Sequence, residues 1–482
     1  MTSQPDVGSG PPPGCPAHTG QPTGELMYGP DFAADPAAAY QRMRRFGPAA
    51  PVQLAPGVDA TLITGYQAAL SVLRSPETFV KDPRRWRALA NGQVPMDSPV
   101  VPMMMYRPNC LFSDGEEHRR LRQVVTDSLE RIDPNELRGY VEESADTLID
   151  QFCARGEADL LAEYARAIPM LVANHMFGCP PDVGERLLAG MSGIFDGVDA
   201  EKANEVLTQA LVELVALKRA KPGADVTSWM MAHPAGLTDE EMLHQLVVLM
   251  GAGTEPEQNL IANGMRLLLS DDRFAGSLSG GSLPVDDALD EVLWTDPPMA
   301  NYAVHYAVHD VDFSGLQLRE GEPIMISFAA ANTDPTLASD QRAGNRAHLA
   351  WSAGPHACPA QSSARLAASV AVEKLLDRLP DLELAVPVET LMWRPGPFHR
   401  ALIALPVRFP PVAPLAAGTS HASASSAPAL TDETSGETSW NASPAPSSST
   451  PPAATFTAKA TGSAPAGRRR WWNSLAGWWR GR

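Results

Sequence analysis

The chain has 482 residues, and its 38 basic and 56 acidic side chains give a formal net charge of −18. This acidic balance argues against bulk binding to nucleic acid, which needs a basic face. No apolar stretch reaches the length of about eighteen residues that a transmembrane helix needs. The N-terminus lacks the basic and apolar regions of a secretory signal, and the scattered cysteines fit reduced thiols. We therefore expect a cytoplasmic protein.

Composition divides the chain into segments. Residues 1–24 are rich in Gly and Pro without periodicity, and we expect them to be disordered. Residues 25–413 have the apolar patterning of a globular domain, mostly helical with a few short strands. Residues 414–467 are rich in Ala, Ser, Thr and Pro, and they bury too little apolar area to offset the entropy of ordering. They are therefore predicted to form a disordered linker.

Residues 468–482 form a basic, tryptophan-rich C-terminal segment. On a helix Trp471, Leu475 and Trp478 would lie at i, i+4 and i+7, with arginines at both ends. Tryptophan favours the headgroup region, and basic amphipathic segments can lie on an anionic membrane. The pattern predicts peripheral contact with the inner face of the membrane. Docking on a partner protein or on the protein's own surface is the alternative.

The strongest local pattern surrounds Cys358. An apolar stripe predicts a helix from Pro359, and its members are Ala368, Val372, Leu375, Leu376 and Leu379. Because proline suits the first helical position, Cys358 is predicted to lie at the cap, where the helix dipole and unpaired backbone N–H groups favour a thiolate. One thiolate without a second cysteine nearby poorly supports zinc or iron–sulfur sites. A buried structural cysteine is the alternative.

The residues around Cys358 carry a second pattern, made of Trp351, Gly354, His356, Cys358, Ala364 and Arg365. It resembles the haem-binding loop of the cytochrome P450 family, aromatic–x–x–Gly–x–His–x–Cys, which opens a helix. The family usually has Phe at Trp351 and Gly at Ala360. The resemblance implies that Cys358 ligates the iron of haem b (iron protoporphyrin IX). It also implies that Gly354 shapes the loop and that His356 lies near a haem propionate.

Further patterns follow in the family's order. His118 and Arg122 lie at i and i+4, like the pair that binds the propionates in the resembled family; a solvated basic face is the alternative. Residues 237–269 predict a long helix opened by a Thr238–Glu241 capping box and interrupted at Gly251, Gly253 and Pro256. This helix resembles the family's central helix, whose Ala–Gly–x–acid–Thr segment lines the oxygen site.

That likeness places Ala252 and Gly253 beside the cofactor. Residues 288–298 resemble the Glu–x–x–Arg helix, and residues 305–335 resemble the β-segment before the haem loop. Together the patterns cover nearly all of residues 25–411. The implied fold is mainly α with a small β region: a triangular helical prism with haem between the central long helix and the Cys-loop helix.

Pro256 is the first departure from the family pattern. It stands where the family has a threonine that relays protons, and proline offers neither a hydroxyl nor an N–H group. It also leaves the Ala252 carbonyl without its donor, so the helix should be kinked. Thr254 cannot substitute, because two positions on a helix are about 200° apart. Glu255, at the family's acid position, is the preferred candidate for proton delivery through water, and Glu257 is a weaker one. The alternative for Glu255 is a solvated or capping carboxylate.

Two other departures concern basic residues. Trp294 replaces the arginine of Glu–x–x–Arg, so that Glu291 would need another cation, for which Arg342 or Arg346 are candidates. In this the chain resembles an actinobacterial subset with Glu–x–x–Trp, whose members tend to be encoded beside sensor-kinase-like and small-GTPase proteins. His305 stands where the family has a propionate-binding arginine, and a surface histidine is the alternative.

The resemblance implies a haem-thiolate monooxygenase that inserts one oxygen atom from O₂ into an apolar small molecule. No flavin, nicotinamide or Cys-rich cluster pattern is present, so electrons should come from a separate ferredoxin and ferredoxin reductase. Substrate selectivity is expected in residues 88–109 and 185–218, whose methionines offer an adaptable lining or serve only as core.

Two alternatives remain open. With Pro256 and Trp294 both present, the protein could instead keep its haem as a sensor in a membrane-associated signalling complex. A peroxide-driven oxygenase would also relax the need for a relay alcohol. Against it, the sequence shows no arginine beside Pro256 that could hold a substrate carboxylate.

Overall fold

The computed structural model describes residues 24–196, 200–271, 273–274, 285–337 and 344–415. The C-terminal segment 468–482, nearly all of the linker 414–467 and Arg342 lie outside the described residues, as does the N-terminal segment apart from residue 24. Within the described ranges, no helix is both long and apolar enough to cross a membrane.

Helices dominate the described chain, as predicted. The longer helices are α6 (Gly115–Leu129), α7 (Pro134–Phe152), α8 (Ala167–Met176), α9 (Pro181–Asp196), α10 (Ala200–Ala220), α12 (Asp239–Ser270), α14 (Val285–Thr295) and α16 (Gln361–Arg378). The shorter helices are α1 (Pro30–Ala34), α2 (Pro36–Met43), α3 (Tyr66–Leu73), α4 (Arg87–Ala90), α5 (Val101–Met104), α11 (Val226–Met231) and α15 (Phe328–Asn332). Single turns are η1 (Arg44–Phe46), η2 (Pro83–Arg85), η3 (Leu161–Ala165), η4 (Gly354–His356) and η5 (Val388–Thr390).

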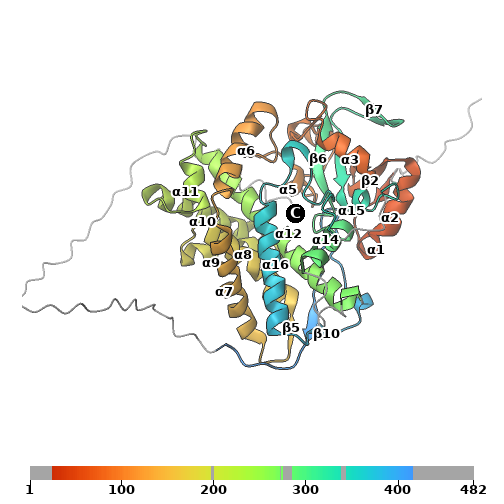
Figure 1. Ribbon diagram of the computed structural model, residues 1–482. Helices are drawn as coiled ribbons and strands as arrows, with labels where there is room; N and C mark the ends of the chain where they lie inside the picture. Colours follow the sequence, from red (N-terminus) through yellow and green to blue (C-terminus); the bar gives the residue numbers. More distant parts are fainter. Residues whose placement is uncertain (1–23, 197–199, 272, 275–284, 338–343, 416–482) are drawn as a thin grey trace, which may run out of the picture.

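The β part is small and lies beside the helical part (Figure 1). Its six-stranded sheet has the order β1 (Glu25–Leu26), β2 (Ala49–Ala55), β3 (Val58–Ile63), β9 (Pro323–Ser327), β6 (Asn301–Ala307) and β4 (Phe79–Val80). A second sheet joins β10 (Glu383–Leu384), β11 (Pro406–Arg408) and β5 (Glu157–Asp159), and a hairpin pairs β7 (Val311–Phe313) with β8 (Leu316–Leu318). The prediction of a mostly helical domain with a few short strands is therefore confirmed.

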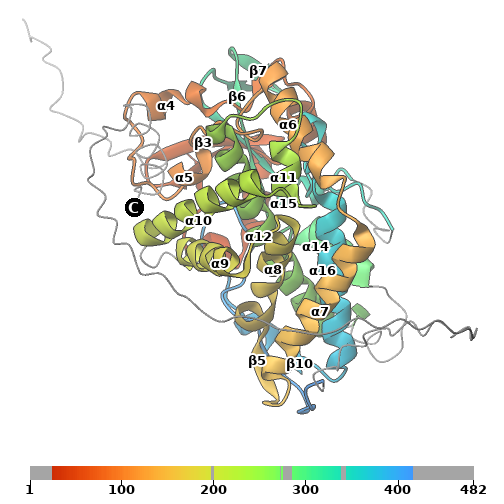
Figure 2. The ribbon, with the colours of Figure 1, turned by 90° about the vertical axis from the view of Figure 1, so that its left-hand side faces the viewer.

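Helix α12 runs through the middle of the molecule (Figures 1 and 2) and packs against α8, α14 and α16. The apolar stripe of α16 is confirmed: Ala368, Val372 and Leu375 are completely buried in the same core cluster as Leu260 and Ile261 of α12. This core fixes the start of α16, and the loop before it, against the central helix.

The predicted capping box of α12 is present. The Glu241 amide donates to the Thr238 hydroxyl at 3.2 Å, and the Thr238 amide donates to the Glu241 carboxylate at 2.8 Å. The predicted interruption is wrong, because α12 is one continuous 32-residue helix with Pro256 inside it. Proline removes only the hydrogen bond to the carbonyl four residues earlier. The backbone hydrogen bonds on either side of Pro256 and the packing of α12 in the core keep the helix continuous.

Candidate active site

The loop that carries Cys358 is closed by short backbone contacts. The Cys358 amide donates to the Trp351 carbonyl at 2.8 Å, and the Ala357 amide donates to the Gly354 carbonyl at 3.1 Å. Gly354 has a φ of +70°, and a Cβ at this position would lie 2.1 Å from the carbonyl oxygen of Leu73. Only glycine fits both the backbone conformation and the space. The predicted role of Gly354 in shaping the loop thus has a steric basis.

Cys358 does not cap the helix, which corrects the sequence prediction. Helix α16 begins at Gln361 with Ala360 as its N-cap residue, so Cys358 lies two residues earlier, in the loop. Burial raises the pKa of the Cys358 thiol, while a hydrogen bond from the Ala360 backbone and the positive charge of Arg122 oppose this rise. On balance the pKa is raised, so the neutral thiol is favoured without a metal, and a bound metal cation would shift the balance toward the thiolate.

Helix α6 carries His118 and Arg122 toward this loop. The Arg122 guanidinium donates to the Ala357 carbonyl, and its Nε donates to the Thr126 hydroxyl at 3.2 Å. His118 is only 5% exposed, and its ring lies 4.0 Å, centroid to centroid, from the ring of His356. The structure thus brings His118, Arg122 and His356 together, as predicted, and excludes a solvated basic face for His118.

His305 reaches the same region from the sheet. The register between β6 and β9 shifts between Tyr302 and His305, and Ala303 within this irregularity has a φ of +49°. The His305 side chain is buried, and its Nδ1 contacts the Ala303 carbonyl oxygen. Burial and the charge of Lys81 hold its pKa well below the ordinary value. A surface histidine is therefore excluded.

Lys81 is the residue that the sequence analysis missed. It follows β4, is 3% exposed, and its Nζ lies 5.8 Å from the centroid of the Tyr302 ring. Burial lowers its pKa to about 7, against the opposing effect of the Asp114 carboxylate. That carboxylate also accepts a hydrogen bond from the Lys81 backbone amide at 2.9 Å. The sequence signal that could have identified Lys81 is the position of a lysine directly after an apolar strand.

These basic side chains repel one another. Burial, then Arg122 and Lys81, lower the pKa of His118 to about 4. The pKa of His356 is lowered by burial and by the nearby Lys81, His118, His305 and Arg122. The Nε2 atom of His118 is buried and has no hydrogen-bond partner among the described residues. We call Lys81, His118, Arg122, His305 and His356 the basic cluster. Buried cations need compensating negative charge, so the basic cluster fits an anionic group such as the two propionates of a haem.

Across from the loop, α12 presents small residues. Ala252 and Gly253 are exposed although they lie in the middle of the central helix, and Pro256 is half-buried. A Cβ added at Gly253 would have nothing within 4 Å. This part of α12 offers a flat face without bulky side chains, which suits a large planar group. Thr254 is buried, and its hydroxyl donates to the Met250 carbonyl of its own helix at 2.9 Å.

Glu255 is neither solvated nor a helix cap. It is 2% exposed and pairs with the Arg394 guanidinium, while the side-chain amides of Gln258 and Asn259 donate to it at 2.9 and 3.2 Å. Burial alone would raise its pKa, but Arg394 and His399, with the hydrogen bonds, hold the pKa below the ordinary value. Glu255 is therefore an anion at neutral pH.

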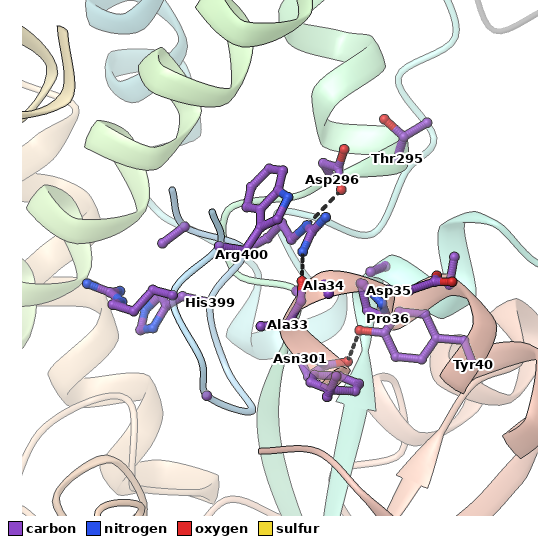
Figure 3. A pocket seen from close by; sticks show the side chains of 18 of the residues that line it. Ala33, Ala34, Asp35, Pro36, Tyr40, Thr295, Asp296, Asn301, His399 and Arg400 are labelled. Carbon is purple, nitrogen blue, oxygen red and sulfur yellow. Dashed lines mark hydrogen bonds and ion pairs between the residues drawn. The ribbon is translucent and has the colours of Figure 1, made fainter. Parts of the chain in front are cut away.

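The sequence shows no arginine beside Pro256, but the fold brings Arg394 to the neighbouring Glu255 from 139 residues away. Arg394 and His399 also line a cavity of about 160 Å³ between α1, α2 and the loop of residues 393–401. Figure 3 shows its wall, where Tyr40 donates to Asn301 at 3.0 Å and Arg400 contacts Asp296. The Arg394 guanidinium is engaged with Glu255, so it does not support carboxylate capture.

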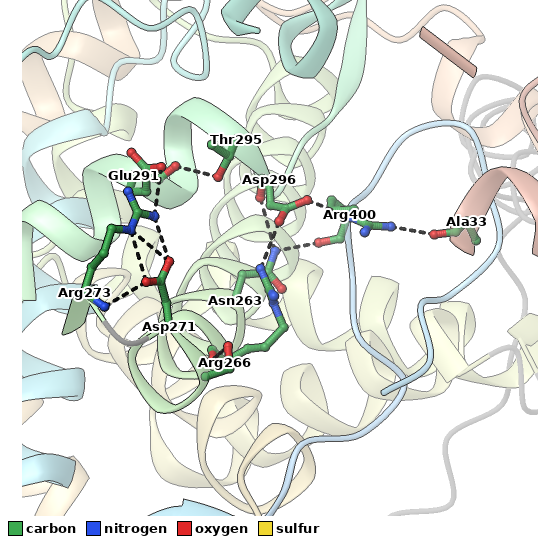
Figure 4. Close-up of polar contacts among 10 residues, drawn as sticks. Ala33, Asn263, Arg266, Asp271, Arg273, Glu291, Thr295, Asp296 and Arg400 are labelled. Atoms are coloured by element: carbon green, nitrogen blue, oxygen red, sulfur yellow. Dashed lines mark hydrogen bonds and ion pairs between the residues drawn. The ribbon is translucent and has the colours of Figure 1, made fainter. Parts of the chain in front are cut away.

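Of the two cations predicted for Glu291, Arg346 pairs with the neighbouring Asp290 instead, and Arg342 lies outside the described residues. Arg346 donates to Asp290, at 3.0 Å, and Arg365 of α16 pairs with the same carboxylate. Glu291 is only partly buried and lies 3.5 Å from Arg273 (Figure 4). Asp290 is 2% exposed, and removing one partner of such a buried pair typically costs about 3–5 kcal/mol.

Trp294 itself is buried, and its Nε1 donates to the Asn345 carbonyl at 2.7 Å. The tryptophan thus ties α14 to the segment before the Cys loop, and Asp290 ties α14 to α16. Because both connections exist, the absence of arginine at position 294 is not an argument against a functional site.

Comparison with known proteins identifies the architecture. No family model matches the chain. Cytochrome P450 monooxygenase PikC of Streptomyces venezuelae is 34% identical over 395 residues, which cover 79% of this chain and 92% of that protein. Mycinamicin IV hydroxylase/epoxidase of Micromonospora griseorubida is 30% identical, with 77% and 95% covered. The solved structure of CYP154A1 from Streptomyces coelicolor A3(2) superposes with a TM-score of 0.70 at 29% identity, covering 80% of this chain and all of the other.

These similarities extend over the whole described domain, and they agree with the Cys loop, the basic cluster and the small-residue face of α12. The predicted fold class is confirmed. The chain therefore belongs to the cytochrome P450 family, and it is a haem-thiolate monooxygenase with its haem between the central long helix and the Cys-loop helix.

Proposed function

We propose that this monooxygenase takes its electrons from a separate ferredoxin and ferredoxin reductase in the cytoplasm and hydroxylates an apolar small molecule. The haem, when bound, supplies oxygen activation. The relative named as a hydroxylase/epoxidase acts on mycinamicin IV, and an apolar substrate for this chain is our extension.

The basic cluster carries the proposal for cofactor binding. We assign Cys358 as the iron ligand and His118, Arg122, His305 and His356 as propionate donors, joined by Lys81. Ala252 and Gly253 form the face of α12 toward the cofactor, and Gly354 keeps the loop close to Leu73. Pro256 keeps the shape of that face without offering a hydroxyl. Residues 88–109 and 185–218 are proposed to set substrate selectivity; Met104 in the first range is buried, whereas Met96 is 56% exposed.

Lys81→Gln tests the cluster. It should lower haem affinity at pH 6 by about tenfold or more, because a hydrogen bond to a charged group contributes about 1.5–3 kcal/mol. Haem-free Lys81 has a pKa of about 7, and an anion raises it. Wild-type affinity should therefore fall as pH rises above 7, and the variant should lack this decline. Haem titrations would measure both effects, with Lys374→Gln on α16 as control. Equal affinities for the two variants would remove Lys81 from the site.

The electron source can be tested with the holoprotein and an apolar fluorogenic ether as probe. NADPH with a bacterial ferredoxin and its reductase should give product under O₂ at a rate above that with hydrogen peroxide alone. Turnover with peroxide only would make the protein a peroxide-driven oxygenase. No turnover by either route would instead favour a catalytically atypical haem protein in a membrane-associated regulatory complex.

Residues 468–482 are proposed to contact the anionic inner face of the membrane through Trp471 and Trp478. The full chain should sediment with vesicles of phosphatidylglycerol and phosphatidylcholine, less so at high salt, because part of the attraction is electrostatic. A chain ending at Leu415 is the control. Equal sedimentation of the two would reject membrane contact and leave docking on a partner protein.

A further inference from the structure

One carboxylate on α14 joins the two segments that flank the Cys loop. Asp290 is 2% exposed, and its Oδ2 atom accepts a hydrogen bond from the Nε atom of Arg346 at 3.0 Å. Its Oδ1 atom pairs with the guanidinium of Arg365. Arg346 precedes Cys358 in the chain, whereas Arg365 follows it on α16. The segment before the loop and the helix after it are therefore held to the same point of α14.

Trp294 lies one turn further along α14 and contacts the first of these segments. Positions i and i+4 share a face of a helix, so Asp290 and Trp294 lie on the same side of α14. The Trp294 indole donates to the Asn345 carbonyl at 2.7 Å, and its ring meets the ring of His348 edge-on, with the centroids 5.7 Å apart. This face of α14 therefore contacts residues 345–348, just before the Cys loop.

Helix α14 is itself fixed in the core. Its apolar residues are buried in the cluster that also includes α12 and α16, and they are Ala288, Leu289, Val292 and Leu293. The side-chain amide of Asn332 on α15 donates to the Leu293 carbonyl at 2.9 Å, and its oxygen accepts from the Leu349 amide at 2.7 Å. Because α14 is packed in this way, its contacts set where the segments beside the Cys loop lie relative to the core.

The acids beside Asp290 on α14 are placed differently. Asp286 lies 3.6 Å from Arg365 and 3.8 Å from Arg346, and its side chain is 46% exposed. Exposed ion pairs of this kind contribute little. Glu291, at the Glu position of the Glu–x–x–Arg pattern, is rotated by about 100° from Asp290, and its carboxylate lies 3.5 Å from Arg273 (Figure 4). Asp290 is therefore the buried acid that reaches both flanking arginines.

We propose that Asp290 is the positioning residue for the iron-binding thiolate, in a chain where Trp294 replaces the arginine of the Glu–x–x–Arg pattern. Backbone contacts shape the loop, and the Asp290 ion pairs hold its two ends where Cys358 can reach the iron. Without this carboxylate, Arg365 would be a buried cation without its close anion, which is costly. The two ends would then move apart, and the thiolate would lose its fixed position.

The positioning role rests on the proposed ligation of a haem iron by Cys358, so the first experiment measures the loop independently of the iron ligand. Hydrogen exchange of the backbone amides, in the full haem-loaded chain, reports how firmly residues 345–358 are held. Asp290→Asn should exchange these amides about tenfold faster or more, because hydrogen bonds between charged groups are among the stronger ones. Asp286→Asn is the matched control and should exchange as the wild type does. Unchanged exchange in Asp290→Asn would overturn the proposal.

The second experiment measures the thiolate itself, in the reduced carbon monoxide difference spectrum. Asp290→Asn should still bind haem, but the long-wavelength Soret band of a thiolate ligand should give way to the shorter-wavelength band of a neutral ligand. Asp290→Glu keeps the charge and should restore part of the long-wavelength band. Asp286→Asn should match the wild type, and far-UV circular dichroism would check that each variant is folded. Equal loss of the band in Asp286→Asn would contradict the assignment to Asp290.

Arg365→Gln tests whether acid and base act as one contact. It should lose the long-wavelength band as Asp290→Asn does. The double variant should be no worse than the more severe single variant, because two residues that share one ion pair do not have additive effects. Additive losses would show that the two residues have separate roles, which the proposal does not allow.

Two further results would decide against the proposal. If Asp290→Asn only lowers the melting temperature and keeps both the exchange pattern and the long-wavelength band, Asp290 stabilises the fold without positioning the thiolate. If Asp290→Asn does not fold, Arg346→Gln takes its place, because the Arg346 side chain is 55% exposed. Its exchange at residues 345–348 should rise, and unchanged exchange would reject the role of Asp290.

Failure of the iron ligand gives a separate signature. If Cys358→Ser keeps the wild-type spectrum, the proposed ligation is wrong and no thiolate is positioned. Faster exchange in Asp290→Asn would then still show that the carboxylate holds the loop. A spectrum that changes in Cys358→Ser but not in Asp290→Asn would leave the ligand in place and reject the positioning role alone.

Discussion

The absence of a side chain at Gly354 is the constraint on which the site depends. The loop before α16 presses against the backbone of residue 73 so closely that even a methyl group would collide with its carbonyl oxygen. This approach, together with the hydrogen bond between the Cys358 amide and the Trp351 carbonyl, fixes the backbone of the loop at Cys358. Arg122 then ties α6 to the loop through the Ala357 carbonyl. The shape of the loop is therefore set by backbone contacts rather than by side-chain packing.

The electrostatics of the site favour a ligand that carries negative charge. His118 and Arg122 lie on α6 and Lys81 follows β4, and the fold brings the two cations close enough to His118 to add to the lowering of its pKa by burial. Such an arrangement costs stability in the isolated protein, and it is relieved by a ligand that carries negative charge. On the other side, α12 offers Ala252 and Gly253 instead of large side chains. A planar dianion with a metal at its centre matches both faces.

Local signals allowed much of this to be predicted. The Thr238–Glu241 capping box and the stripe of α16 are short-range patterns, and the structure has both. The pairing of Glu255 with Arg394 and the pairing of Asp290 with Arg365 join segments far apart in sequence, where one chain carries no periodic signal. The interruption of α12 and the start of α16 were predicted from proline and glycine, but tertiary packing overrode those local preferences.

The central claim is that Cys358 ligates a haem iron. The reduced carbon monoxide difference spectrum of the haem-loaded protein tests it most directly, compared with that of Cys358→Ser. The account predicts the long-wavelength Soret band of a thiolate ligand in the wild type and its loss in the variant, with the Cys153→Ser protein unchanged. An identical spectrum for wild type and Cys358→Ser would contradict the account.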